Sequence, residues 1–451
     1  MDAARTQGRI VMAAGLSDHR SAVRAAEHAC ERCAAGLGSR AGGGPADLVV
    51  LLLSHHHLEA AQAIATIVRK RLATRCLIGV SASAVLGGGI ELEETPGVSL
   101  LAMVAPGVRV KAFRLDELDR PRSGNIESYE NLALGAGIGP EHRGTILLAD
   151  PFSVAMNTLL PALSRLRSER GRRRAGRTAG TDEAAPGVGP ILGGLASAAR
   201  KPGGNVLILN DEVTRRGGVG VSLSGGIRVD SLVSHGCRPF GPIFVVTGAK
   251  GQIVTTLSGR PALQALHEAI ESLSEQARQL LRNHVFLGRA INEYKPRFGR
   301  GDFLVRHLIG VDQDTGAVVV ADLVRVGQTV QFHLRDPATA DEDLGLLLDG
   351  QKLHDPPLGA LLFTCNERGR SLFSTPHHDA AAVTRAFGPE PTAEDRARAG
   401  VAIGPEGPEG PRGGRGVPLA GFFAAGEIGP VGDEVFLHGH TASLAIFRDP
   451  A

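Results

Sequence analysis

The chain has 451 residues, 43% of them hydrophobic and 21% charged, which is typical of a globular protein with a large core and room for more than one domain. Its formal net charge of +2, its two Tyr and its lack of Trp argue against a nucleic-acid partner, which needs basic surface and stacking rings. No apolar run reaches the roughly 18 residues that a membrane helix needs, so we expect no membrane partner.

The cysteines and the N-terminal segment predict a cytoplasmic protein. Five cysteines form no even disulfide framework, and the chain does not start with a charged and then apolar signal segment. Cys30 and Cys33 make a CxxC motif, but it lies in a helical pattern without a second pair. Incidental helix cysteines are therefore favoured over a zinc or redox site. We interpret residues 1–46 as an Ala-rich N-terminal extension that is helical in part.

A repeated order of strands and helices starts at residue 47. "DLVVLLLS" is an apolar run typical of a buried strand, and "LEAAQAIATIVRKRLA" has apolar residues at helical spacing. Two strand-like runs follow, "CLIGVSAS" and "GVSLLAMVAPG". The order strand, helix, strand, strand recurs over residues 144–226 and again over 359–447. We infer three divergent copies of one α/β unit.

Two low-complexity segments interrupt the second and third copies at the same topological position. They are the Arg-rich residues 168–188 and the Gly- and Pro-rich residues 388–416. Such compositions bury little apolar surface, so both segments are predicted to be flexible, exposed insertions.

Different material lies between the second and third copies. Alternating apolar residues predict a hairpin over "GPIFVVTGAKGQIVTTLSG", another around residues 314–316, and a further strand in "GQTVQFHLRD". One long amphipathic helix is predicted over residues 260–281. The fold class is therefore α/β (α+β), with mixed β-sheets flanked by helices and a β-meander insertion. We place a division near residue 235, giving domains over 47–235 and 236–447.

Charged groups inside apolar segments indicate a ligand site. In the repeat alignment Glu427 falls on a strand tip that the other copies fill with small residues. Glu427 could receive a ligand ammonium, and Arg238 or Arg368 a ligand carboxylate, so an amino-acid-like ligand would suit both. The alternative is a buried Glu427 paired with one of these arginines.

We hypothesise that the ligand-binding residues share one cleft at the domain junction; they are Arg238, Cys237, Asn366, Arg368, Glu427 and His438. An alternative of another class is a thiol-dependent hydrolase that uses Cys365 or Cys237 with His377 or His438. No local catalytic signature accompanies these cysteines, and free Cys is most often a packing residue. We therefore expect no catalytic residues.

Several motifs carry a resemblance to a known family: "GGGIELEETPGVSLLA", "LLADPFS", "GCRPFGP", "GDFLVRHLIGVD", "LLFTCNERG", "PHHD" and "GEIGP…FLHGHTAS". In this order they resemble FIST-domain proteins, with an N-terminal and a C-terminal part, from about residue 47 to 447. The resemblance implies an intracellular sensory module that binds small ligands such as amino acids. Such modules often accompany histidine kinases, cyclic-di-GMP enzymes or chemoreceptors, and some bind haem and sense nitric oxide.

The chain also departs from the family pattern. Val80 stands where the family often has Cys, His235 where Gln is expected, Glu367 where Gly is usual and His440 where an aromatic residue is common. The haem-binding alternative would use His377 and His378 as ligands; otherwise we expect neither a cofactor nor a metal. The signal would pass to a separately encoded partner, a histidine kinase or a cyclic-di-GMP enzyme.

Overall fold

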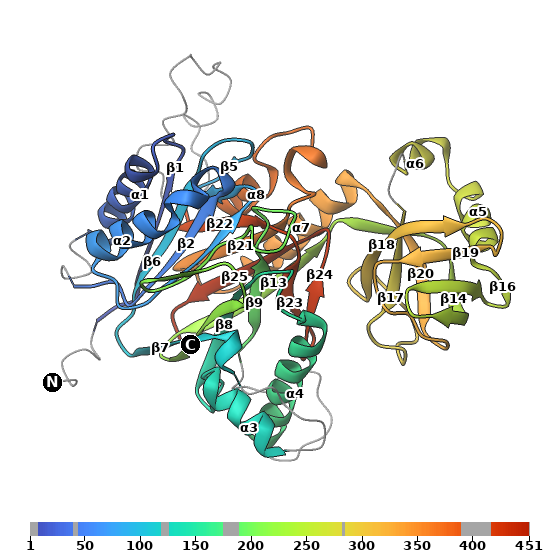
Figure 1. Ribbon diagram of the computed structural model, residues 1–451, viewed down its shortest axis with the longest axis horizontal. Helices are drawn as coiled ribbons and strands as arrows, with labels where there is room; N and C mark the ends of the chain where they lie inside the picture. The colour runs from blue at the N-terminus through green and yellow to red at the C-terminus, as the bar shows by residue number, and fades with distance from the viewer. Residues whose placement is uncertain are drawn as a thin grey trace.

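Three six-stranded mixed sheets and one barrel make up the computed structural model, which describes residues 8–38, 44–118, 126–174, 189–281, 285–388 and 416–450 (Figure 1). The three sheets and their helices form one body, and the barrel lies at its side. The predicted class of mixed sheets flanked by helices is confirmed.

The spatial order of the strands within each sheet brings together segments that are far apart in the chain. Sheet I holds β1 (Val11–Ser17), β6 (Val98–Val104), β2 (Leu48–Ser54), β3 (Leu77–Ala82), β10 (Leu207–Leu209) and β11 (Glu212–Thr214). Sheet II holds β7 (Val108–Arg114), β12 (Gly218–Gly225), β8 (His142–Ala149), β9 (Ile191–Leu195), β23 (Glu427–Val431) and β24 (Glu434–His438). Sheet III holds β13 (Arg228–His235), β25 (Thr441–Arg448), β21 (Gly359–Cys365), β22 (Leu419–Ala424), β4 (Val85–Gly87) and β5 (Ile90–Leu92).

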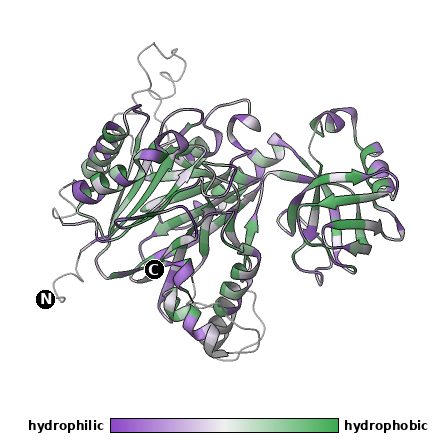
Figure 2. Cartoon of the chain, in the orientation of Figure 1, coloured by the Kyte–Doolittle hydropathy of each residue, from purple (hydrophilic) through white to green (hydrophobic). Residues whose placement is uncertain are grey.

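Two α-helices cover the outer face of each sheet. Sheet I packs against α1 (Ala22–Leu37) and α2 (Ala61–Leu72), sheet II against α3 (Ile126–Gly135) and α4 (Met156–Arg174), and sheet III against α7 (Pro337–Gln351) and α8 (His378–Phe387). Short 3-10 turns complete the body: η3 (His55–Ala60), η4 (Leu115–Glu117) and η5 (Gly369–Ser371). The helices turn their polar faces outward (Figure 2).

The three inferred copies are confirmed, and each is longer than the sequence indicated. Every copy runs strand, helix, strand, helix, strand, hairpin, strand along the chain. The sequence did not assign the first strand and helix to any copy, although a helical pattern was recognised within residues 1–46. In the first copy these are β1 and α1, which lie in the segment interpreted as an N-terminal extension. Strand β1 pairs antiparallel with β6, from Val11 opposite Val104 to Ser17 opposite Val98.

The hairpins of the three copies are exchanged between sheets. The hairpin β4–β5 of the first copy pairs with β22 of the third, β10–β11 of the second pairs with β3 of the first, and β23–β24 of the third pairs with β9 of the second. Each sheet is therefore completed by another copy, and none of the three is finished on its own.

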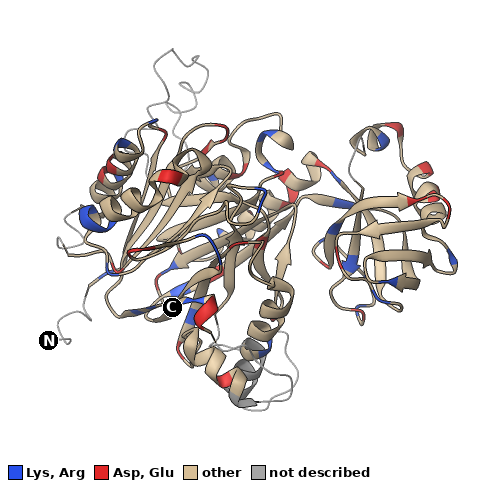
Figure 3. Ribbon diagram, viewed as in Figure 1, with Lys and Arg blue, Asp and Glu red and all other residues tan. Residues whose placement is uncertain are grey.

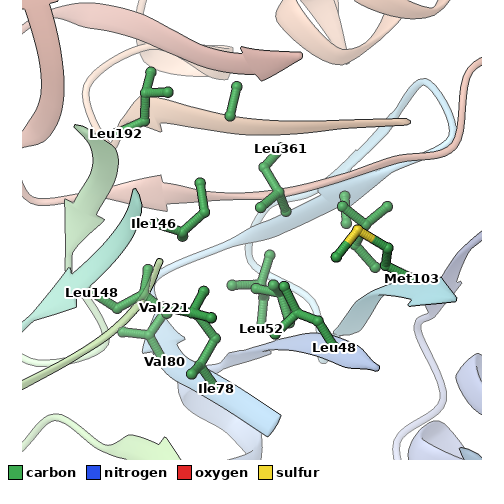
Figure 4. Close-up of a cluster of buried hydrophobic side chains, with 14 of the residues drawn as sticks. Leu48, Leu52, Ile78, Val80, Met103, Ile146, Leu148, Leu192, Val221 and Leu361 are labelled. Atoms are coloured by element: carbon green, nitrogen blue, oxygen red, sulfur yellow. The ribbon is translucent and has the colours of Figure 1, made fainter. Parts of the chain in front are cut away.

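The inner faces of the three sheets share one hydrophobic core (Figure 4). Leu52 and Val80 of sheet I, Ile146 of sheet II, and Phe363 and Phe422 of sheet III all belong to it. Strands β2 and β21 are buried at every residue because the core covers one face and helices cover the other. Such central strands read as continuous apolar runs, which is why the sequence predicted them correctly.

The same glycine recurs in the third strand of every copy. Gly79 in β3, Gly193 in β9 and Gly421 in β22 are each the third residue of their strand. A Cβ at any of them would lie closer than 3.0 Å to a backbone carbonyl oxygen of the neighbouring parallel strand: that of Leu51, Leu147 or Leu362. Close approach of the two strands therefore requires glycine at this position.

We predict that Gly421→Ala destabilises the protein by about 3 kcal/mol or more, because the obstructing atom is backbone and cannot move aside as a side chain would. Gly345→Ala is the matched control, since Gly345 lies inside helix α7 with open space where a Cβ would be. That change should stabilise by up to about 1 kcal/mol. Urea unfolding of both variants measures the difference, and equal stabilities would refute the role of Gly421.

The barrel is inserted into the third copy, between β13 and α7. Six strands close it in the order β14 (Cys237–Lys250), β20 (Thr329–Arg335), β17 (Val285–Ala290), β18 (Phe303–Asp312), β19 (Ala317–Val320) and β15 (Ile253–Leu257), with β15 returning to β14. Strand β16 (Arg260–Pro261) extends β15. Both predicted hairpins are present, as β14–β15 and β18–β19. The sequence predicted a meander, and its closure into a barrel is seen only in the structure.

The predicted single helix over residues 260–281 is wrong in its extent. The structure has two helices, α5 (Ala262–Glu271) and α6 (Glu275–Leu280). Ser274 separates them, and its side chain accepts a hydrogen bond from the backbone N–H of Ala277 at 3.3 Å. Ser274 therefore starts a second helix, although the apolar residues keep a helical spacing over the whole segment.

The two predicted insertions lie largely outside the described residues. Of residues 168–188, those up to Arg174 belong to helix α4 and not to a loop, and 175–188 are not described. Of residues 388–416, only the two ends are described. Among the described helices none has the length and apolar character needed to cross a membrane.

Candidate functional site

The chain crosses from the body into the barrel at a single glycine, Gly236, between β13 and β14. Its N–H donates to the carbonyl oxygen of His440 at 3.0 Å. A Cβ at this position would lie 2.6 Å from that oxygen and 3.0 Å from a terminal nitrogen of Arg368. The crossing is therefore packed against the ends of β21 and β24, where most of the predicted site residues lie. Figure 3 shows acidic and basic residues together where the barrel joins the body.

The third strands of the three copies end at one place inside the body. Ser197 follows β9 and accepts a hydrogen bond at 2.9 Å from the backbone N–H of Ser83, which follows β3. The Ser197 hydroxyl donates another to the carbonyl oxygen of Phe423 in β22. Leu195 and Ala425 are joined through their backbones, with the Ala425 N–H donating to Leu195 at 3.0 Å. The expected clustering of strand tips is thus present, and Glu427 begins the strand that leaves it.

Arg368 makes a fully buried ion pair with Asp379. The guanidinium donates from Nε to Oδ2 at 2.7 Å and from a terminal nitrogen to Oδ1 at 2.9 Å, and both side chains are 1% exposed. Thr364 donates to Asp379 at 2.6 Å, and a ring nitrogen of His378 lies 2.9 Å from it. Burial disfavours this carboxylate, but the charge of Arg368 and these hydrogen bonds hold the pKa of Asp379 well below its usual range.

We predict that Asp379→Ala costs about 3–5 kcal/mol of stability, because it leaves the Arg368 charge buried without a counterion. Asp341→Ala is the control: Asp341 also contacts His378, at 3.0 Å, but is 69% exposed. Its loss should cost less than about 1 kcal/mol. Chemical denaturation of both variants gives the comparison, and a small effect of Asp379→Ala would show that the pair is dispensable.

Glu427 is fully buried, and no guanidinium of the described residues is bonded to it. Its Oε2 accepts from the backbone N–H and the hydroxyl of Thr441 at 3.1 and 2.8 Å, while Oε1 has no hydrogen-bond partner among the described residues. Burial raises the pKa of Glu427 to about 8, although Thr441, the charge of Arg368 and the nearby Cys365 thiol act in the opposite direction. Burial therefore favours the protonated form of Glu427.

This shift predicts how stability depends on pH. Between a pKa near 4.5 in the unfolded chain and about 8 in the folded one, only the unfolded chain ionises at Glu427, so stability falls as pH rises through that window. The loss is at most roughly 1.4 kcal/mol per pH unit. Glu427→Gln cannot ionise, so its unfolding free energy should fall less between pH 5 and 8 than that of the wild type. Urea unfolding at both pH values tests this; parallel profiles would contradict it.

Two other predicted site residues lie beside these groups. Cys237 is buried, and burial raises the pKa of its thiol to about 12, opposed by the charges of Arg335 and Arg368. His438 pairs with Glu427 across β23 and β24 and has a ring nitrogen 3.1 Å from the carbonyl oxygen of Gly429. Burial, with His235 next to it, lowers the pKa of His438 to about 3. The structure therefore brings Cys237, Arg368, Glu427 and His438 together as neutral or internally paired groups.

The remaining two predicted site residues are directed elsewhere. Arg238 is 35% exposed and pairs at 2.8 Å with Asp336, whose other oxygen caps the start of helix α7. Arg238 thus joins the start of barrel strand β14 to the cap of helix α7. Asn366 is exposed, and its side-chain oxygen accepts from the Cys365 thiol at 3.8 Å.

A polar cluster that was not predicted from the sequence joins the barrel to the body. Glu367 follows β21 and lies 3.5 Å from a ring nitrogen of His307 in barrel strand β18, 3.4 Å from Arg335 in β20 and 3.3 Å from His440 of the body. A hydrogen bond from His307 and the charges of His440 and Arg335 lower the pKa of Glu367 to about 2 despite partial burial. Glu367 and His440 were singled out as departures from the family; His307 had no signal beyond strand alternation.

A cavity of about 820 Å³ lies next to this junction, between the barrel, helix α4 and strand β24. We call it the junction cavity. Its volume falls in the range of small-molecule sites. It is lined by Gln252, Arg289, Leu304, Arg306, Ala321, Asp322 and Leu323 of the barrel, by Met156, Asn157, Leu160, Pro161, Ser164 and Arg165 of α4, and by Glu434, Val435, Phe436 and Leu437 of β24. None of the predicted ligand-binding residues is among them.

Comparison with known proteins shows the family. Residues 47–260 match the model of the FIST N domain, and residues 262–393 match that of the FIST C domain. The chain belongs to the FIST family. FIST domains are sensory domains that bind small ligands, and the resemblance inferred from the sequence motifs is confirmed.

Relatives of this FIST protein occur in mycobacteria. It is 37% identical over 432 residues to an uncharacterized protein of Mycobacterium tuberculosis strain H37Rv, covering 95% of this chain and 96% of that protein. An uncharacterized protein of Mycobacterium bovis is 35% identical over 404 residues, 89% of this chain and 90% of its own. A crystal structure of cyanuric acid hydrolase from A. caulinodans is 10% identical and covers 50% of this chain and 72% of the hydrolase chain. Its TM-score of 0.23 is too low to indicate a shared fold.

The haem alternative does not fit His378, one of the two histidines expected to ligate it. Both ring nitrogens of His378 are within 3.0 Å of carboxylates, Asp379 and Asp341, and the ring stacks on Phe373 with centroids 3.5 Å apart. Nδ1 of His377 accepts from the backbone N–H of Glu91 at 3.1 Å. An iron ligand needs a free imidazole nitrogen, and His378 offers none.

The two cysteines considered for the hydrolase alternative, Cys237 and Cys365, do not have activated thiols. Burial raises the pKa of Cys237 to about 12 and that of Cys365 well above its usual range, so both stay protonated near neutral pH. His438 bonds the carbonyl oxygen of Gly429, and His377 bonds a backbone N–H near α8. Cys30 and Cys33 of the CxxC motif are also buried, facing the core of sheet I.

Proposed function

We propose that this FIST protein is a cytoplasmic, non-catalytic sensor that binds a small carboxylate-bearing metabolite, such as an amino acid, in the junction cavity. The observation that carries the proposal is the cavity itself, which lies between the barrel and the body and is lined by charges of both signs. Ligand sites occur preferentially at such interfaces, in largely apolar cavities with a few polar groups.

The charges in the cavity suit a carboxylate. Arg289 and Arg306 share one counterion, Asp322, at 3.7 and 3.4 Å, so two guanidiniums are balanced by one carboxylate. The Nε of Arg289 is buried and has no hydrogen-bond partner among the described residues. A ligand carboxylate would supply the missing charge and acceptor through a two-pronged hydrogen bond. Glu434 of β24 would accept an ammonium group, and leucines supply apolar walls.

The position of the cavity supplies a way to report occupancy. Its barrel wall and its body wall meet through Arg306, which donates to the carbonyl oxygen of Leu437 in β24 at 2.8 Å. A ligand held by both walls would favour the arrangement in which barrel and body are close, and a ligand shifts an equilibrium by that difference in affinity. We infer that a separately encoded partner, a histidine kinase or a cyclic-di-GMP enzyme, reads this change.

The proposal is tested by screening amino acids and related carboxylates for an increase in melting temperature, followed by calorimetry. We expect Arg289→Gln to weaken binding of the best ligand by roughly 10- to 150-fold, the loss of one charge-assisted hydrogen bond. Arg260→Gln is the matched control: Arg260 is also on the barrel, is 54% exposed and pairs with Glu268 away from the cavity.

Two results would overturn the proposal. One is a screen in which no carboxylate metabolite raises the melting temperature. The other is an affinity that Arg289→Gln and Arg260→Gln leave equally unchanged, which would place the ligand outside the junction cavity. The buried Arg368 and Glu427 would then return as the first candidates, tested by Glu427→Gln under the same conditions.

A further inference from the structure

The second cluster at the junction has the composition of a metal site. His307, Glu367 and His440 each offer one ligand atom, and these three atoms lie within 4.8 Å of one another. They come from three separate places in the chain: barrel strand β18, the segment after β21 and the turn between β24 and β25. Two imidazoles and one carboxylate form the donor set of many divalent zinc sites, which bind through three protein ligands and keep a fourth position open.

From this geometry we propose that His307, Glu367 and His440 bind a Zn²⁺ ion that joins the barrel to the body. This goes beyond the proposed sensor function, because none of the three residues lines the junction cavity.

The distances fit a shared ion. Ligand atoms bound tetrahedrally at about 2.0–2.1 Å are separated from each other by roughly 3.4 Å. The Nε2 of His307 lies 3.5 Å from one oxygen of Glu367, and the Nδ1 of His440 lies 3.3 Å from the other. Both separations are close to the distance expected between two ligand atoms of one ion. An ion placed between the two imidazoles and the carboxylate would contact all three residues.

The surroundings hold the ligands in place. The ring of Phe286 is fully buried against both imidazoles, with centroids 4.6 Å from His307 and 4.4 Å from His440. His440, in the turn before β25, has a left-handed backbone with φ of 62°, and its Nδ1 lies 3.3 Å from Glu367. A rigid, partly apolar wall of this kind fixes ligand orientation.

Access and charge also agree with a site that exchanges its ion or a fourth ligand with solvent. The side chains of Glu367 and His307 are 37% and 32% exposed, whereas His440 is 7% exposed. The nearby Arg335 is a competing cation, but one of its terminal nitrogens is held by the carbonyl oxygens of Glu367 and Ser371. The other lies 3.4 Å from the Glu367 carboxylate and would move away when an ion binds.

The test uses the full chain, stripped with a chelator and titrated with Zn²⁺ against a chromophoric competitor. We expect about one tightly bound ion per chain, and a visible absorption band of low-coordinate Co²⁺ when cobalt replaces zinc. His440→Asn and His307→Ala should each weaken binding by more than about 100-fold, beyond the effect of losing an outer-sphere partner. Asn suits the left-handed backbone at residue 440.

His267→Ala is the matched control, since it removes an exposed imidazole from barrel helix α5 and leaves the cluster intact. Folding of each variant is checked by its melting curve in chelator, and His307→Ala, on a partly exposed strand position, carries the test if His440→Asn does not fold. No zinc uptake by the wild type would overturn the proposal. So would equal uptake by wild type, His307→Ala and His267→Ala, because the ion would then be bound elsewhere.

Discussion

The exchange of hairpins among the three copies is the constraint on which the rest of the structure depends. Each sheet takes its last two strands from a different copy, so the edge left after the third strand is covered only when all three copies are present. The third strands lie at these joints, where a glycine in each lets the parallel neighbour approach closely. One core can then be shared by three sheets, and the strand tips are forced together inside it.

This arrangement explains why charged groups are found in the interior. Arg368 and Glu427, which follow β21 and β22, are buried where the copies meet. Arg368 is stabilised by Asp379 at the start of α8, which ties the helix to the strand end. Glu427 has no such counterion among the described residues, and burial raises its pKa so that the protonated form is favoured. Burying a charge is costly, and the two side chains avoid this cost differently. Arg368 stays ionised beside a counterion, whereas the neutral form is favoured for Glu427.

The inserted barrel forms a junction with one edge of the body. The chain leaves at Gly236 and returns at helix α7, and side chains from both parts then meet: Glu367 with His307 and Arg335, and Arg306 with β24. Because the barrel is connected only at one end, such polar contacts determine how closely it lies against the body. A ligand in the junction cavity and an ion at the neighbouring cluster would each act on that same contact.

The sequence by itself determined the class of fold, the three copies and most central strands, because local periodicity and continuous apolar runs report burial directly. It also marked Glu427, Arg368 and His438 as polar residues in apolar surroundings. Only the tertiary structure decided the partners: Asp379 for Arg368, Asp336 for Arg238, and the hairpin of one copy for the sheet of another. Closure of the barrel, the junction cavity and the meeting of His307 with Glu367 and His440 were likewise beyond the sequence. Apart from Arg368 and Asp379, which are eleven positions apart, these contacts join residues tens to hundreds of positions apart. Nothing in the spacing of a single chain records which distant segments become neighbours.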